Sequence, residues 1–156
     1  MNRCYFVFTA ICATLALAPV AATSQVATSD VKEAVERLQG RGIHVSLFID
    51  PEPAQIETAK EASAHAIEIH TGSYCNASGR ERDEELGAIV SAVTLARKLG
   101  LEVHGGHGLN YDNVQPVARL PEIRELNIGH AIVARAVFAG LGAAVREMKA
   151  LVDAAR

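Results

Sequence analysis

An α/β fold with one parallel sheet is the fold class that this sequence predicts, and three observations predict it. Short apolar runs alternate with helical patterns in the order α-βα-βα-βα-βα. Apolar residues make up 49% of the chain and aromatic residues only 4%, so aliphatic side chains must supply the core, as is usual in buried parallel strands. The 156 residues suffice for one domain with a real core.

The individual elements follow from apolar spacing and from turn residues. The first helix begins at Ser29 or Asp30 and ends at Gly40. Strands are expected over 44–50, 66–71, 101–105 and 125–128, the first of them buried. Further helices are expected over 53–63, 80–99, 114–120 and 131–155, the last bent or broken near Gly140 and Gly142, and 73–79 is expected to be a polar loop.

Two architectures fit this order of elements. One is a small doubly wound sheet, and the other is part of a (β/α)8 TIM barrel. A complete barrel takes about 250 residues, so four βα units with parallel strands would form half of one. In a barrel the active site lies at the carboxyl ends of the strands, and phosphate often binds after the last two strands.

The N-terminal segment differs in composition from the rest of the chain. Residues 1–24 contain an almost wholly apolar run over 5–20 and small residues that suit cleavage after Ala22, which is the layout of a secretory signal peptide. The run is short for a membrane span. The alternative is a mis-assigned start or a fused remnant. Residues 25–29 are then a linker, and 30–156 form the domain.

Charge and cysteine content exclude several classes of protein. The net charge is −3, no Lys/Arg cluster stands out, and aromatic platforms for bases are lacking, so nucleic-acid binding has little support. Cys4 and Cys12 fall in the N-terminal segment, which leaves Cys75 as an ordinary loop residue or a thiol near a site. The histidines show no zinc-binding spacing, so we expect no metal site.

The stretch LEVHGGHGL over 101–109 carries the first candidate site. His107 follows a strand end between glycines, where its imidazole can act as a general acid or base near neutral pH. The alternative is a histidine whose ring is satisfied by a backbone carbonyl. His104 lies within the strand and is expected to point into a barrel interior.

Glycines at two neighbouring strand ends predict an anion site. The backbone N–H groups at Gly108 and at Gly129-His130 can face a phosphate, and the helix that follows His130 adds its N-terminal dipole. The alternative is that these glycines only form tight βα turns.

Glu68 is an acidic residue inside an apolar strand, between two isoleucines. A carboxylate there should be paired, hydrogen-bonded or functional, and it can stabilise a cationic intermediate or exchange a proton. His70, next on the same face, is its candidate partner, and a salt bridge within the barrel wall is the alternative. His44 and His65 precede strands at the opposite end and are expected to be structural.

The segments HVSLFID, AIEIHTG, HGGHGLNYDNV, PEIRELNIGHAIVARAVFAGL and VREMKAL together resemble the C-terminal half of the pyridoxine 5′-phosphate synthase family. These are (β/α)8 enzymes of vitamin B6 biosynthesis, and the resemblance covers about 31–156. It implies condensation of 3-amino-2-oxopropyl phosphate with 1-deoxy-D-xylulose 5-phosphate, with release of phosphate and water. It also implies a cytoplasmic homo-oligomer, typically an octamer, without a metal or organic cofactor; the signal-like segment leaves export as the alternative.

The resemblance assigns roles to five residues. His107 matches the family's catalytic proton donor, and Glu68 matches the glutamate that stabilises the transition state. Gly108 matches a residue that binds the amino-ketone substrate. Gly129 and His130 match the pair that holds the phosphate end of that substrate.

Two departures from the family pattern accompany the resemblance. Gly105 stands where the family usually has alanine. The catalytic histidine and glutamate and the ketose-phosphate ligands of the family's first four strands have no counterpart in this sequence. We therefore expect a second copy or a separate N-terminal half to complete the site, or else a non-catalytic phosphate-binding half-barrel or truncated remnant.

Overall fold

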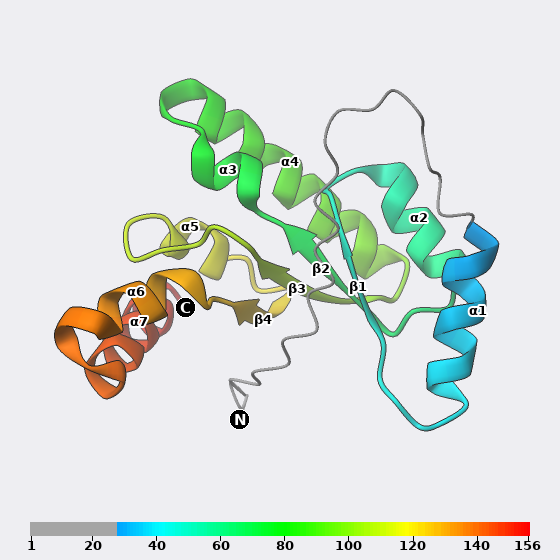
Figure 1. The fold of residues 1–156 in the computed structure, drawn as a ribbon. Helices are drawn as coiled ribbons and strands as arrows, with labels where there is room; N and C mark the ends of the chain where they lie inside the picture. Colours follow the sequence, from blue (N-terminus) through cyan, green and yellow to red (C-terminus); the bar gives the residue numbers. More distant parts are fainter. Residues whose placement is uncertain (1–27) are drawn as a thin grey trace, which may run out of the picture.

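The computed structural model describes residues 28–156, which build a four-stranded parallel sheet with helices packed against it (Figure 1). The strands are β1 (Ser46–Ile49), β2 (Ala66–His70), β3 (Glu102–Gly106) and β4 (Ile123–Asn127). The helices are α1 (Thr28–Gln39), α2 (Pro53–Glu61), α3 (Gly72–Asn76), α4 (Gly79–Lys98), α5 (Val114–Ala118), α6 (His130–Ala139) and α7 (Leu141–Ala155). The predicted signal-like segment 1–24 lies outside the described residues, as does most of the predicted linker.

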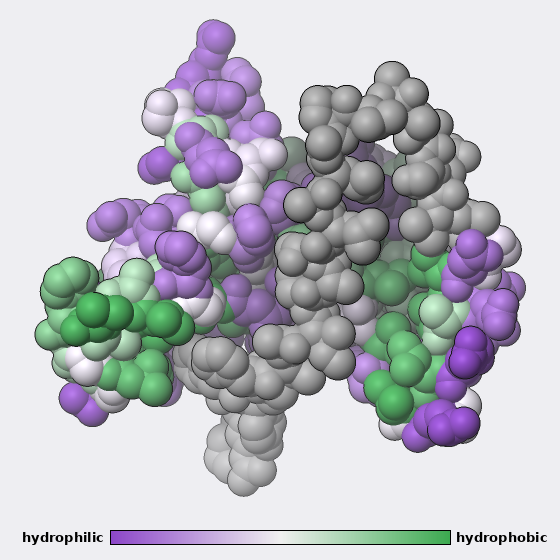
Figure 2. Space-filling model, viewed as in Figure 1, coloured by the Kyte–Doolittle hydropathy of each residue, from purple (hydrophilic) through white to green (hydrophobic). Residues whose placement is uncertain are grey.

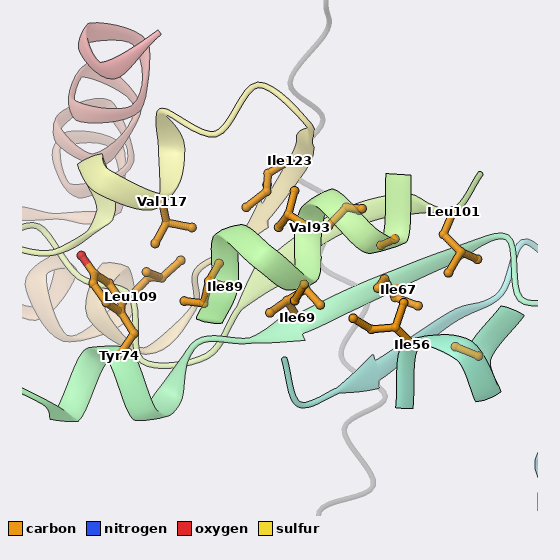
Figure 3. Close-up of a cluster of buried hydrophobic side chains, with 14 residues drawn as sticks. Ile56, Ile67, Ile69, Tyr74, Ile89, Val93, Leu101, Leu109, Val117 and Ile123 are labelled. Atoms are coloured by element: carbon orange, nitrogen blue, oxygen red, sulfur yellow. The ribbon is translucent and has the colours of Figure 1, made fainter. Parts of the chain in front are cut away.

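One face of the sheet is apolar and carries the core. Side chains alternate between the two faces of a strand, so Ile67, Ile69 and Val103 point to the same side. Helices α2 and α4 cover them there, with Ile56 and Ile89 among the buried contacts (Figure 3). A second cluster, in which α5, α6 and α7 pack together, extends this layer beside β4. The continuous aliphatic core explains why so few aromatic residues suffice.

The other face of the sheet is polar. Glu68 of β2 pairs in register with Phe48 of β1 and with His104 of β3, so these side chains share the face opposite the isoleucines. Asn127 of β4 lies on the same face and bonds to Glu68. Polar side chains inside three adjacent strands indicate that this face of the sheet is a candidate functional surface rather than a packing surface.

The strand order bears on the two predicted architectures. The order is β1-β2-β3-β4 without a reversal, and the core helices lie on one face, as in a segment of a (β/α)8 barrel. A doubly wound sheet has a reversal of strand order and helices on both faces. The prediction of an α/β fold with four parallel strands is thus confirmed. Within residues 28–156 the sheet is open, with β1 and β4 as its outer strands.

Three sequence predictions were wrong in detail. The expected buried strand at 44–50 is the shorter β1, which alternates exposed and half-buried residues because it lies at the sheet edge; Phe48 is 52% exposed. The loop expected at 73–79 begins with the helical turn α3, which buries Tyr74 against the core. The last strand begins at Ile123 rather than at Glu125.

The C-terminal helix pair exposes apolar side chains. The predicted break occurs at Gly140, whose φ of 80° separates α6 from α7. Val137 and Phe138 are 76% and 91% exposed, and Val133 and Leu141 are also exposed. Figure 2 shows this hydrophobic surface at the end of the molecule formed by α6 and α7. Among residues 28–156, no helix is long and apolar enough to cross a membrane.

Candidate functional site

The turn after β3 holds His107 in an unusual backbone conformation. β3 ends at Gly106, and the next two residues, His107 and Gly108, have φ values of 75° and 82°. Glycine adopts this left-handed region readily, whereas a residue with a side chain does so at a cost of about 1–2 kcal/mol. His107 is also exposed. A strained, exposed histidine at a strand end is a feature of functional sites.

Thr71 stabilises this turn through hydrogen bonds to its backbone. Its hydroxyl donates to the carbonyl oxygens of Gly106 and His107, at 2.8 and 2.6 Å, and its backbone N–H donates to the same Gly106 oxygen at 2.8 Å. Thr71 is fully buried. Cys75 packs against Gly108 so closely that a Cβ added to the glycine would lie 2.8 Å from the Cys75 Cβ. The residues after β2 therefore fix the turn after β3.

Two aromatic rings lie beside the His107 ring and form a cluster with it. Its centroid lies 4.7 Å from that of His70 and 6.3 Å from that of Phe48. The His70 Nδ1 atom lies 3.1 Å from an Asp50 carboxylate oxygen, which orients the ring. A side chain at Gly72 would collide with the His70 ring and crowd His107. The cluster therefore depends on residues from three consecutive strand ends.

Glu68 accepts its hydrogen bond from Asn127, whose amide nitrogen lies 2.8 Å from Oε2. The prediction that His70 partners Glu68 is wrong, since His70 binds Asp50 instead and acts on Glu68 only at longer range. A side chain at Gly106 would overlap the other carboxylate oxygen of Glu68. The carboxylate is thus held by a neutral amide, and it has room because residue 106 has no side chain.

Burial raises the pKa of the Glu68 carboxyl above its ordinary value. The hydrogen bond from Asn127 and the nearby His104 pull the pKa back down, whereas the Glu125 carboxylate adds to the rise. A carboxyl with a raised pKa takes up and releases protons closer to neutral pH, as acid–base chemistry requires.

His104 lies on the polar face, and its Nε2 atom lies 3.1 Å from a carboxylate oxygen of Glu102. That hydrogen bond lowers the pKa of the Glu102 carboxyl. At the opposite end of the strands the His44 and His65 rings stack with centroids 4.3 Å apart, and His65 Nδ1 accepts the Val45 N–H. The structural role expected for these two histidines agrees with their contacts.

The end of β4 leads directly into α6. Gly129 is the N-cap residue of α6 and His130 its first residue, and both are exposed. Gly129 has a φ of −108°, and a Cβ added there would meet nothing within 4 Å. The N–H groups of the first turn of a helix have no partner within the helix and favour anions. This end of the sheet therefore offers donors and open space.

The register of the sheet brings the predicted residues to one edge. Gly106 of β3 pairs with Asn127 of β4, so the His107–Gly108 turn and, one residue further on, the Gly129–His130 segment follow a pair of adjacent residues. Asn127 in turn binds Glu68. Four of the five predicted site residues thus follow the carboxyl ends of β3 and β4, and Glu68 lies in the middle of β2, joined to that end of β4 by Asn127. Among residues 28–156, no group of three His, Cys, Asp or Glu side chains could hold a metal ion.

Sequence reasoning missed Thr71, Asn127 and Asp50. Thr71 and Asp50 each follow a strand directly, and Asn127 is the last residue of β4. Each of these was a visible signal, because polar residues at the carboxyl ends of parallel strands converge on one edge. Cys75 contacts the site through Gly108, and burial raises the pKa of its thiol, so it is a packing residue rather than a reactive thiolate.

The chain matches a protein family over residues 22–154, described as Pyridoxal phosphate biosynthesis protein PdxJ. A pyridoxine 5′-phosphate synthase of Parasynechococcus marenigrum is 55% identical over 119 residues, which are 76% of this chain and 48% of that protein. One of Syntrophotalea carbinolica is 52% identical over 126 residues, 80% and 53% of the two chains. This chain therefore spans about half the length of these relatives.

A solved structure also matches this chain. The crystal structure of the Amycolatopsis orientalis BexX/CysO complex aligns with a TM-score of 0.49 at 17% identity, covering 80% of this chain and 51% of that one.

Proposed function

The chain belongs to the PdxJ family of pyridoxal phosphate biosynthesis proteins, and from this premise we propose that it carries one half of a pyridoxine 5′-phosphate synthase site. In this proposal the site takes 3-amino-2-oxopropyl phosphate and condenses it with 1-deoxy-D-xylulose 5-phosphate. One observation carries the proposal: His107 and the N-terminus of α6 follow neighbouring strand ends, and Asn127 at the end of β4 holds the half-buried carboxylate of Glu68.

The phosphate of the amino ketone fits the end of β4. The N–H groups at Gly129 and His130 begin a helix of ten residues, whose dipole favours an anion at this end. The space above Gly129 is free of other described side chains and leaves room for a phosphate group. Gly108, at the neighbouring strand end, contacts the rest of the substrate in this proposal.

His107 and Glu68 supply the acid–base chemistry. Condensation of an amine with a ketone forms a C=N bond and releases water, and this requires a proton on the departing hydroxyl. His107 is exposed at the strand end and donates that proton. Glu68, held by Asn127, stabilises the positive charge that develops on the nitrogen. Protein side chains supply both the proton and the charge stabilisation, so the proposal requires no metal or organic cofactor.

A partner completes the site in this proposal. The chain matches only about half of each relative, and its sheet has outer strands at β1 and β4 within residues 28–156. A second copy or a separate N-terminal half would supply the ketose-phosphate ligands and cover the polar face. The exposed apolar residues of α6 and α7 support assembly with another chain, since such patches mark interaction surfaces. The substrates are metabolites, which favours the cytoplasm over export.

A non-catalytic phosphate-binding half-barrel is the second candidate function. The coverage of the relatives favours it, because half of a site can bind one substrate without turning it over. It predicts binding of the amino-ketone phosphate with no product.

Formation of pyridoxine 5′-phosphate tests the proposal. The full chain is given both substrates, alone and with the N-terminal half of the Syntrophotalea carbinolica relative. We expect product in at least one mixture, and none from His107→Ala. His44→Ala is the matched control, because His44 is exposed at the opposite end of the strands. A folded chain that binds substrate but yields no product in either mixture would contradict the synthase and favour the binding half-barrel.

A further inference from the structure

The backbone of His107 is fixed more firmly than its side chain. Among residues 28–156, the His107 ring makes ring contacts with Phe48 and His70. Its backbone carbonyl, in contrast, accepts a 2.6 Å hydrogen bond from the Thr71 hydroxyl. The direction of the imidazole therefore depends on the conformation of the turn that carries it.

The Thr71 hydroxyl faces two successive carbonyl groups. It lies 2.8 Å from the Gly106 oxygen and 2.6 Å from the His107 oxygen, in a fully buried position. Successive carbonyls of a regular strand point in opposite directions, so one donor can reach both only because the chain turns at His107. The hydroxyl therefore reaches both carbonyl oxygens only while His107 is left-handed, and it would lose one acceptor if the backbone of His107 were extended.

The two carbonyls differ in their other donors. The Gly106 oxygen also accepts the Thr71 backbone N–H at 2.8 Å, a bond that any residue at position 71 except proline can make. Among residues 28–156, the second donor to the His107 oxygen is the Cys75 thiol, at 3.6 Å, which is a weak donor. Removing the hydroxyl therefore affects His107 far more than Gly106.

We propose that Thr71 is a positioning residue, whose hydroxyl holds His107 in the left-handed conformation that presents its imidazole at the strand end. This rests on the proposed role of His107 as proton donor. Thr71 also anchors α3, since its carbonyl accepts the N–H of Cys75, the residue that packs under Gly108. The junction of β2 and α3 thus contacts both residues of the turn, His107 through Thr71 and Gly108 through Cys75.

Three variants of the full chain test the proposal. Thr71→Val keeps the shape and removes the donor, and Thr71→Ser keeps the donor. Thr94→Val is the matched control, because it removes a hydroxyl that bonds a carbonyl at 2.8 Å on the exposed side of α4, away from the site. If the valine variant fails to fold, Thr71→Ala removes the same donor without adding bulk.

The first measurement is the backbone conformation of His107 by NMR, from its amide–Hα coupling and its Cα and Cβ shifts. In Thr71→Val these signals move away from left-handed values or split into several conformers, whereas Thr71→Ser and Thr94→Val keep the wild-type signals. An unchanged left-handed His107 in the valine or alanine variant overturns the proposal. This measurement needs no activity, so it stays decisive if the proposed synthase function fails.

The second measurement applies where the wild-type mixture forms product. A misplaced proton donor lowers kcat by about 100-fold and changes KM little, because substrate contacts remain in place. Thr71→Ser restores kcat to near the wild-type value. An equal kcat in wild type and Thr71→Val overturns the proposal, as does a change confined to KM. Loss of product in every chain, the wild type included, refutes the proposed function alone.

Discussion

The turns after β3 and β4 look alike in sequence and differ in the structure. Both place a glycine beside a histidine at the carboxyl end of a strand. After β3, Gly108 is left-handed and packs against Cys75, with the Thr71 hydroxyl bonded beneath the turn. After β4, Gly129 has an ordinary φ and open space around it.

This difference separates two reasons for a glycine. Gly108 is required by the fold, because its backbone conformation and the closeness of Cys75 both exclude a side chain. Nothing in residues 28–156 demands a glycine at position 129. In the proposed function, a phosphate that approaches the start of α6 would account for Gly129. The β3 turn is fixed by contacts within the chain, and the space around Gly129 is open.

Alanine substitution at both glycines is the strongest way to break this comparison. Gly108→Ala forces a left-handed alanine against Cys75 and should lower the free energy of unfolding by about 2 kcal/mol or more. Gly129→Ala should change it by less than about 0.5 kcal/mol, as at an open surface site. Urea unfolding of the full chain measures both. Equal losses at the two positions would remove the distinction.

A charge at the open end sharpens the comparison further. Gly129→Asp adds a carboxylate where the proposal puts a phosphate, so we expect affinity for inorganic phosphate to fall at least about tenfold. Calorimetric titration of the full chain measures the binding. Gly87→Asp makes the same change at an exposed, uncrowded glycine of α4 and should leave affinity unchanged. A Gly129→Asp chain that binds phosphate as well as the wild type would place the anion elsewhere.

The hydrogen bond from Asn127 connects the end of β4 to Glu68 of β2, and the Glu68 carboxylate gives a pH signature. Burial raises the pKa of Glu68, so its stabilising contribution is complete below about pH 4.5 and is lost as pH rises through the raised pKa. Glu68→Gln removes this titration. The free energy of unfolding of the wild type, relative to the variant, should therefore fall as pH rises above 4.5 and then level off. Urea unfolding at a series of pH values checks this, and a rising difference would be the opposite sign.

The smallest expected effect concerns Glu102, on the same polar face, whose contribution to stability depends on pH with the opposite sign. The hydrogen bond with His104 lowers the pKa of Glu102, so its contribution is present above about pH 4.5 and is lost as pH falls through the lowered pKa. Glu102 is exposed, so Glu102→Gln should reduce stability only slightly at neutral pH. The same pH series measures it, and no difference between variant and wild type is expected in strong acid.

The sequence predicted the order of elements better than their surroundings. Alternating apolar runs predicted four parallel strands, and Gly140 correctly marked the break in the last helix, because both signals are local. The exposure of Phe48 depends on β1 being an outer strand, which local periodicity cannot reveal.

The site shows the same division. Glu68, His107 and the glycines were visible as polar or flexible residues at strand ends. The sequence does not show which residues they bond to, since the bond from Asn127 to Glu68 spans 59 positions and the bond from Thr71 to His107 spans 36. Only the register of the sheet decides which side chains meet. The sequence therefore suggests Glu68 as the partner of His70, whereas the structure pairs His70 with Asp50.

The most direct test of the proposed half-site is an NMR titration of the full chain with 3-amino-2-oxopropyl phosphate. We expect saturable shifts of the backbone amides of Gly129, His130 and Gly108, which Gly129→Asp abolishes while the chain stays folded. A folded wild-type chain without shifts at Gly129 and His130, or with the same shifts in Gly129→Asp, would contradict it.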